Sequence, residues 1–320
     1  DAEGITGDEL QKFVNDDLFP SLKELPPKTP SHTLLRTAFE DIDGVPVQRV
    51  LAHVDAQLPV LELPAGADQA LQDAIDARLQ QLSSEPFDLA RAPLFRAQLL
   101  RISAHDHVLA FVVHHAVADG WSIGILAREL PLLYERALRG EPLDAPAGTP
   151  RLEFADYALW ERRRLSGGAA QTALAYWTQQ LAGLEPIELP ADRPRPHAGS
   201  PRGGCLEFSL DPGILAALKA LARSHRATLH MVLLAAFQTL LMRVTGQRDF
   251  AVGTPTAGRA RPELEGVFGM FVNMLVMRTD LDGNPAFVEL LERTRATALE
   301  AYAHQEIPFE RIVAELNPRR

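Results

Sequence analysis

Hydrophobic and polar positions along the chain follow two periods. Short apolar or alternating runs predict strands, and segments with apolar residues three and four positions apart predict helices. The expected strands are residues 34–39, 45–50, 94–102, 108–115, 206–210, 250–254 and 271–279, and the expected helices are residues 68–83, 121–138, 212–224, 229–244 and 285–302. Strands and helices interleave throughout, so the pattern predicts an α/β sandwich of two similar lobes.

Turn residues sharpen three of these boundaries. Asp43-Gly44 stands between the first two strands and predicts a hairpin. Asn284-Pro285 is expected to open the last helix, with asparagine as the cap and proline at the first helical position. Residues 189–204 are rich in proline, arginine, glycine and serine, which indicates an extended connection or surface loop.

The composition narrows the class of protein. The chain has 320 residues, of which 46% are hydrophobic, so it has enough apolar material for two buried cores. Its formal net charge of -10 argues against a nucleic-acid binder, which needs clustered lysine and arginine. The single cysteine, Cys205, excludes an internal disulfide and a multi-cysteine zinc site, and its position suggests a small core residue at a strand start.

No segment indicates secretion or membrane insertion. The first ten residues have neither a basic start nor an apolar run. The most apolar long segment, residues 229–244, is too short to span a bilayer and is interrupted by Gln238 and Arg243. We therefore expect a cytoplasmic fragment of a larger protein that binds neither nucleic acid nor membrane.

Two adjacent histidines stand where an expected strand meets a turn and a helix. Successive side chains on a strand point to opposite faces, so His114 and His115 are not expected to serve one site together. Taken alone, two adjacent histidines are as consistent with polar residues that end a strand as with a functional site. A metal site made by His115 and Asp119 is disfavoured, because Gly120 and the preceding strand argue against a helix through them.

The position of the pair favours acyl-transfer chemistry. Backbone N–H groups converge at a helix start, and a neutral imidazole accepts a proton at cytosolic pH. In this interpretation His115 accepts the proton and the N–H of Gly120 stabilises an oxyanion. Asp119 would either hold the histidine tautomer or form an ion pair that fixes the loop, and we favour the ion pair.

A serine hydrolase is the competing interpretation. The run Gly120-Trp121-Ser122-Ile123-Gly124 has the letters of a nucleophile elbow. In such an enzyme the serine follows its strand directly and the histidine comes late in the chain, whereas here both histidines precede the serine. We therefore expect Ser122 to be a polar residue in the first helical turn.

The run from His114 to Gly120, followed by Trp121-Ser122, resembles the signature of nonribosomal peptide synthetase condensation domains. Four further segments resemble motifs of the same family: residues 31–39, 154–160, 267–273 and 304–310. The family's first motif is missing, and another would begin only at Arg319-Arg320. The five matching motifs nevertheless keep the family's order.

The resemblance implies a fold and a set of site residues. The fold is two chloramphenicol-acetyltransferase-like α/β lobes, residues 1–166 and 167–320, in a V with a tunnel between them. His115 would be the catalytic histidine, with Asp119 and Gly120 as its framework. The supporting residues would be His114, Arg36, Trp121, Ser122, Arg259 as an ion-pair partner of Asp119 across the lobes, and Asn273 beside the tunnel. Arg36 and Arg259 are also consistent with solvated arginines.

The resemblance also implies an activity and partners. A donor acyl group would pass from one carrier-protein thioester to the amine on a second carrier protein, and an adenylation domain would lie alongside in a larger synthetase. No metal or resident cofactor is expected, because the carrier proteins deliver 4′-phosphopantetheine. The residues that follow Asp119 favour the amide-forming type, and the surrounding sequence is closest to condensation domains that accept an L-configured donor. A stand-alone acyltransferase using coenzyme A and a catalytically idle module that docks carrier proteins remain alternatives.

Overall fold

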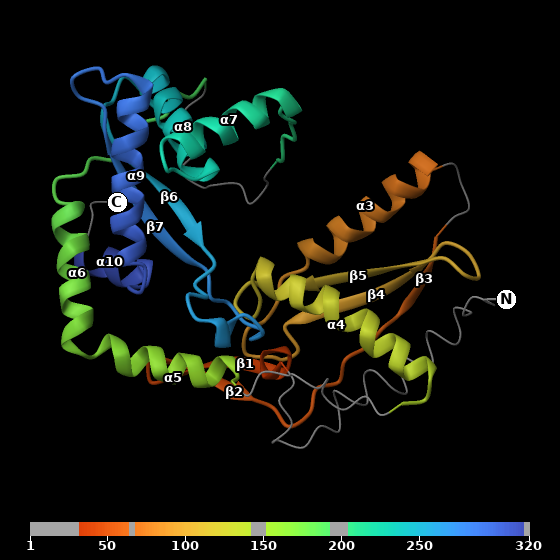
Figure 1. Ribbon diagram of the computed structural model, residues 1–320. Coiled ribbons are helices and arrows are strands. Elements are labelled where there is room, and N and C mark those ends of the chain that lie inside the picture. The colour runs from red at the N-terminus through yellow and green to blue at the C-terminus, as the bar shows by residue number, and fades with distance from the viewer. Residues whose placement is uncertain (1–31, 64–67, 142–151, 193–203, 317–320) are drawn as a thin grey trace. The chain divides into compact units, whose positions relative to one another are not determined.

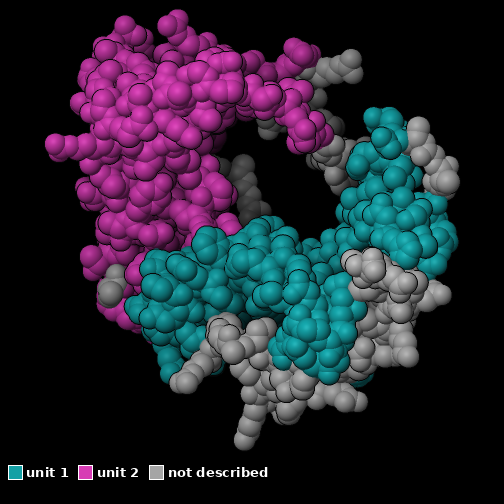
Figure 2. Space-filling view, turned by 45° about the vertical axis from the view of Figure 1, so that its right-hand side comes forward, with its two compact units in different colours: residues 1–163, 259–271 teal, residues 164–258, 272–320 magenta. Residues whose placement is uncertain are grey.

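The computed structural model describes residues 32–63, 68–141, 152–192 and 204–316 (Figure 1). The chain divides into two compact units (Figure 2). The first unit comprises residues 1–163 together with Arg259–Phe271, and the second comprises Arg164–Gly258 and Val272–Arg320. The segment Arg259–Phe271 packs with the first unit, which a single boundary at residue 166 does not describe. The predicted limits of the two lobes stay a prediction.

The first unit opens with a short 3-10 helix and a hairpin. The helix η2 (Thr33–Arg36) leads into β1 (Thr37–Ile42), which pairs antiparallel with β2 (Val45–Val50). Asp43 and Gly44 have φ values of 54° and 78°, and two positive φ values make the primed turn that matches strand twist. The predicted hairpin and its turn are confirmed, but its first strand is Thr37–Ile42 and not residues 34–39, because residues 34–36 belong to η2.

A three-stranded sheet forms the centre of the first unit. Its order is β3 (Val60–Glu62), β4 (Phe95–Arg101) and β5 (His107–Val113), with β3 parallel and β5 antiparallel to β4. Alternation along β4 sends Ala97 and Leu99 to one core and Leu100 to the other. Helix α4 (Gly120–Leu138) packs on the first face and α3 (Asp68–Ser84) on the second (Figure 1).

The second unit surrounds a two-stranded sheet. Its strands, β6 (Asp249–Thr256) and β7 (Asn273–Asp280), are antiparallel, and its helices are α6 (Gly168–Gln180), α7 (Pro212–Ser224), α8 (Leu229–Thr245), α9 (Phe287–Ala303) and α10 (Phe309–Leu316). Helix α5 (Phe154–Leu165) begins in the first unit. The 3-10 helix η3 (Pro262–Leu264) lies in the returning segment, Arg259–Phe271, by which the chain comes back to the first unit. Trp177, Phe250 and Leu291 are fully buried in the core of the second unit.

Helices α7 and α8 begin where side chains satisfy the first backbone donors. Asp211 accepts from the N–H of Gly213 at 2.7 Å, and Thr228 accepts from the N–H of Met231 at 3.2 Å. Among the described residues no single helix is long and apolar enough to cross a bilayer. Only α7 and α8 taken together meet those conditions, and they are bent by 104°.

Three details of the second unit were predicted wrongly. Residues 206–210 form no strand, because no described strand pairs with them. The side chains of Leu206 and Phe208 are 89% and 83% exposed. Cys205 is exposed as well, so it is not a core residue. Helix α9 begins at Phe287 with Ala286 as its N-cap residue, and Asn284 lies before the helix with a left-handed φ of 51°.

Candidate active site

The two histidines lie just beyond the end of β5. The strand ends at Val113, although the N–H of His114 still donates to the carbonyl of Leu94 at 2.8 Å. His115 lies in the turn that leads to α4. The expectation that both histidines stand on the strand is therefore wrong. Their different environments come from the turn and not from strand alternation.

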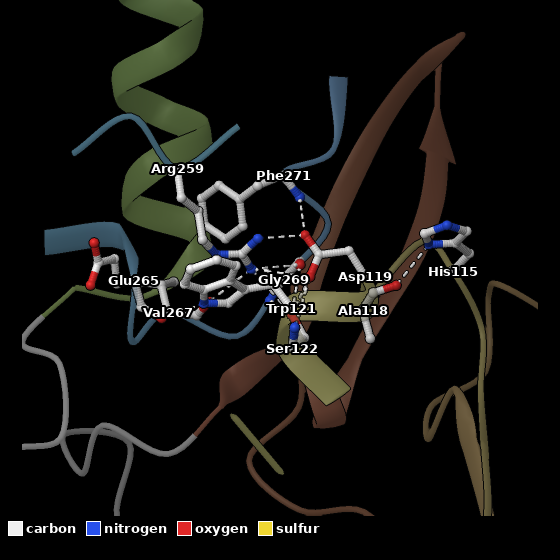
Figure 3. A network of polar contacts seen from close by, with 10 residues as sticks. All are labelled: His115, Ala118, Asp119, Trp121, Ser122, Arg259, Glu265, Val267, Gly269 and Phe271. Carbon is white, nitrogen blue, oxygen red and sulfur yellow. Dashed lines mark hydrogen bonds and ion pairs between the residues drawn. The ribbon is translucent and has the colours of Figure 1, made fainter. Parts of the chain in front are cut away.

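The turn holds the two imidazoles in opposite tautomers. Nδ1 of His115 lies 2.8 Å from the carbonyl oxygen of Ala118 (Figure 3), and a carbonyl oxygen can only accept. The neutral ring therefore carries its proton on Nδ1 and leaves a lone pair on Nε2. His114 shows the reverse, because its Nδ1 accepts from the N–H of Ala116 at 3.0 Å. His115 is exposed and His114 is half-buried.

Asp119 caps helix α4 from a buried position. Its carboxylate accepts from the N–H of Ser122 at 2.8 Å, from Arg259 at 2.6 Å and from the N–H of Phe271 at 3.1 Å. Burial raises the pKa of Asp119, but the hydrogen bonds from Arg259, Ser122 and Phe271 outweigh it and hold that pKa below its ordinary value. Asp119 is therefore a carboxylate with its acceptor sites occupied.

Arg259 is the ionic partner of Asp119. Its side chain is 1% exposed, and its guanidinium lies 4.2 Å from the ring centre of Phe271. It also donates to the carbonyls of Val267 and Gly269 at 3.1 and 3.2 Å. The predicted ion pair is present, and the alternative of a solvated arginine is wrong. Both partners belong to the first unit, so the pair does not bridge the two units as expected.

Ser122 has no room to act as a nucleophile. It is fully buried, and its hydroxyl lies 2.8 Å from both Asp119 Oδ1 and the carbonyl of Gly269. The same oxygen accepts from the N–H of Gly269 at 2.9 Å. Because His115 contacts Ala118 and not this hydroxyl, the geometry argues against the hydrolase interpretation.

Two further contacts hold the segment Arg259–Phe271 in the first unit, one at the start of α4 and one at the start of α5. The indole N–H of Trp121 donates to the carbonyl of Glu265 at 2.8 Å. A Cβ at Gly269 would clash with the ring of Phe154, so only glycine permits this approach. A Cβ at Gly120 would meet no heavy atom within 4 Å, and Gly120 is exposed at the helix start.

Asn273 and Arg36 take structural positions. In the second unit, the amide of Asn273 donates to the carbonyls of Gln305 and Ile307, both at 2.8 Å, and its oxygen accepts from the N–H of Phe309 at 3.0 Å. It thereby fixes the loop before α10. In the first unit, Arg36 is 4% exposed and donates to the carbonyl of Leu51, so Arg36 is not a solvated charge.

Sequence reasoning missed the backbone atoms of the site. The carbonyl of Ala118, the N–H of Phe271 and both backbone groups of Gly269 take part, and every residue type offers such groups. The only available signal was the matching segment 267–273. Within the described ranges no group of three or more histidine, cysteine, aspartate or glutamate side chains is placed to hold a metal ion.

A family model for the condensation domain matches residues 21–320. The chain belongs to the condensation-domain family. This condensation domain is 44% identical over 290 residues to one of the linear gramicidin synthase proteins of Brevibacillus parabrevis and 43% identical over 289 residues to chondramide synthase cmdD of Chondromyces crocatus. Both alignments cover 90% of the chain, which spans only 6% and 7% of the lengths of those synthases.

Solved structures share the fold of this condensation domain. SgcC5 from Streptomyces globisporus has a TM-score of 0.78 at 30% identity, with 98% of this chain and 68% of that chain covered. The X-domain from teicoplanin biosynthesis has a TM-score of 0.81 at 30% identity, with 91% and 64% covered. The four-domain synthetase AB3403 has a TM-score of 0.80 at 25% identity, with 99% and 23% covered.

The comparisons confirm two predictions made from the sequence. They confirm the family, and they confirm the α/β fold of the chloramphenicol acetyltransferase type. The V-shaped arrangement of the lobes and the tunnel between them stay predictions.

Proposed function

We propose that this condensation domain forms amide bonds between two carrier-bound substrates. The acceptor amine attacks the carbonyl carbon of the donor thioester, the C–S bond breaks, and the proton lost by the amine goes to the departing thiolate. The products are an amide on the acceptor carrier and a free thiol on the donor carrier. Membership of the family and the high identity to peptide synthases support this activity.

The tautomer of His115 is the observation that carries the mechanism. With its proton on Nδ1, the ring presents the Nε2 lone pair, and no described residue donates to that nitrogen. The exposed ring accepts a hydrogen bond from the incoming amine and takes its proton as the C–N bond forms. General-base help contributes about 10²–10⁴ in rate, and orienting the amine contributes as well.

The other residues act around this histidine. Asp119 is occupied by Arg259 and by backbone donors, so it fixes the turn and does not exchange protons with His115. Gly120, the exposed first residue of α4, supplies an N–H at the positive end of the helix for the oxyanion of the tetrahedral intermediate. His114, Arg36, Trp121 and Asn273 support the surrounding structure.

The partners follow from the same proposal. Donor and acceptor carrier proteins bring the substrates on 4′-phosphopantetheine, and an adenylation domain of the same cytoplasmic synthetase loads them. The similarity to a four-domain peptide synthetase supports this setting. No resident cofactor takes part.

The test is a single-turnover assay with donor and acceptor carrier proteins charged with a panel of L-amino acids. We expect dipeptidyl acceptor carrier by mass spectrometry, and a loss of about 10²–10⁴ in rate for His115→Ala. The matched control is His105→Ala, which removes an exposed histidine of the same unit and should keep full activity. Full activity in His115→Ala would refute the mechanism. Product formed from coenzyme A thioesters alone, or carrier binding without any product, would favour the other two functions.

A further inference from the structure

The buried hydroxyl of Ser122 lies between the turn that holds His115 and the returning segment Arg259–Phe271. We propose that Ser122 is a positioning residue for His115. By bonding to Gly269 it fixes Asp119, and Asp119 in turn fixes the Ala118 carbonyl that holds Nδ1–H of His115. The kinetic part of this inference rests on the proposed function, whereas the structural part does not.

The first link runs from the returning segment to Ser122. A hydroxyl has one proton to donate and two lone pairs to accept with. Ser122 Oγ accepts from the N–H of Gly269 at 2.9 Å and from Arg259 at 3.2 Å, and it donates to Asp119 or to the Gly269 carbonyl, each at 2.8 Å. Since the side chain is fully buried, no water replaces a lost partner without rearrangement.

The second link runs from Asp119 to the ring of His115. The carbonyl of Ala118 and the N–H of Asp119 belong to one planar peptide unit, so turning that plane moves the carbonyl oxygen. The plane is fixed because the carboxylate of Asp119 caps α4 through Ser122 N–H at 2.8 Å and through the Ser122 hydroxyl. If the cap loosens, the carbonyl leaves Nδ1, and His115 is then free to carry its proton on Nε2.

His114 provides an internal reference. Its Nδ1 is held by the N–H of Ala116, which does not belong to the peptide unit that Asp119 fixes. The inference therefore requires a change at Ser122 to alter the tautomer of His115 and to leave that of His114 unchanged. A general loss of structure in the turn would disturb both rings.

The experiment measures imidazole nitrogen shifts in the ¹⁵N-labelled chain at pH about 8.5, where histidine is ordinarily neutral. In the unaltered protein we expect His115 protonated on Nδ1 and His114 on Nε2. Ser122→Ala should give a mixture of tautomers at His115 alone. Ser83→Ala is the matched control, because this exposed serine of the same unit also donates to a backbone carbonyl, at 3.0 Å, and should change neither ring.

A second variant and the kinetics separate positioning from folding. Ser122→Cys keeps the shape of the side chain, with a larger atom that forms a weaker hydrogen bond, and it decides the question if Ser122→Ala does not fold. We expect kcat for amide formation to fall about tenfold in Ser122→Ala with KM unchanged, because substrate binding is untouched while the base is misprotonated.

The outcomes distinguish this inference from the proposed function. An unchanged His115 tautomer in a folded Ser122 variant, or unfolding of both variants, would overturn the inference whatever the activity. If Ser122→Ala shifts the His115 tautomer while the unaltered protein forms no amide, the inference is supported and the proposed function alone is overturned.

Discussion

Replacing Asp119 with asparagine tests whether its ion pair with Arg259 holds the first unit together. The side chain keeps its shape, but the charge is lost and one acceptor oxygen becomes a donor NH₂ group. Oδ1 faces the N–H of Ser122 at 2.8 Å, while Oδ2 faces Arg259 at 2.6 Å and the N–H of Phe271 at 3.1 Å. Both positions face donors, so the amide opposes a donor in either orientation.

The magnitude follows from burial. The two side chains are 1% and 0% exposed, and removing one partner of a buried pair costs about 3–5 kcal/mol, because the remaining charge has no compensation. Domains are stable by only about 5–15 kcal/mol, so the loss takes a large share of the total. The first unit should therefore unfold at a much lower urea concentration in Asp119→Asn.

A surface pair provides the matched control. Arg278 and Asp249 in the second unit also form a two-point contact, at 2.8 and 2.7 Å, but their side chains are 23% and 47% exposed. An exposed pair of this kind contributes about 0–1 kcal/mol. Asp249→Asn therefore makes the same chemical change without the burial, and we expect little loss of stability.

The assay has to report on each unit separately, because a chain with two units need not unfold in one step. Urea unfolding followed by circular dichroism gives the overall loss, and hydrogen exchange of the Ser122 and Phe271 amides reports opening of the first unit. If Asp119→Asn costs no more than Asp249→Asn, or leaves exchange at those two amides unchanged, the argument that burial makes this pair important is wrong.

Three further expectations concern the same region. The pKa of Asp119 in the folded protein lies below its ordinary value of 3.8. Its charge therefore stabilises the fold fully above pH 3.8, and this stabilisation is lost as the pH falls through the lower pKa of the folded state. Because Asp119→Asn has no such charge to lose, its stability should fall less steeply in acid. Gly269→Ala should cost about 1–3 kcal/mol through its clash with Phe154, whereas Gly120→Ala, with no atom within 4 Å, should keep the thermal midpoint; equal midpoints would contradict the close approach. Trp121→Phe should cost about 0.5–1.5 kcal/mol in urea unfolding by removing the bond to Glu265, and an unchanged midpoint would show that this exposed bond contributes nothing.

Local patterns predicted most of the elements because local forces determine them. The hairpin follows from the positive φ values that Asp43-Gly44 tolerates, and α3 follows from its leucine and isoleucine spacing. Residues 206–210 alternate apolar and polar residues as a strand does, but they form no strand, because a strand also needs a neighbour to pair with. Periodicity describes one segment and says nothing of that neighbour.

In the candidate site, too, contacts between residues close in the sequence were predictable and contacts with distant segments were not. His115, Asp119 and Gly120 stand close together in the sequence, so their local arrangement was accessible. Arg259 follows Asp119 by 140 positions, and only the family resemblance suggested the pair. The contacts of Gly269 and Phe271 were not predictable from residue types, because they use backbone groups of a segment whose return to the first unit is a tertiary event.

In the turn before α4, Asp119 provides stability and His115 provides the proposed chemistry. The charge of Asp119 is fully engaged by Arg259 and backbone donors, so it is not available to polarise the imidazole, and a backbone carbonyl sets the tautomer of His115 instead. His115 is exposed, so His115→Ala should remove activity with little effect on stability. Asp119→Asn should lower both, and activity should fall through the loosened turn. The sequence pairs the two residues within one motif, but their physical roles are distinct and can be measured separately.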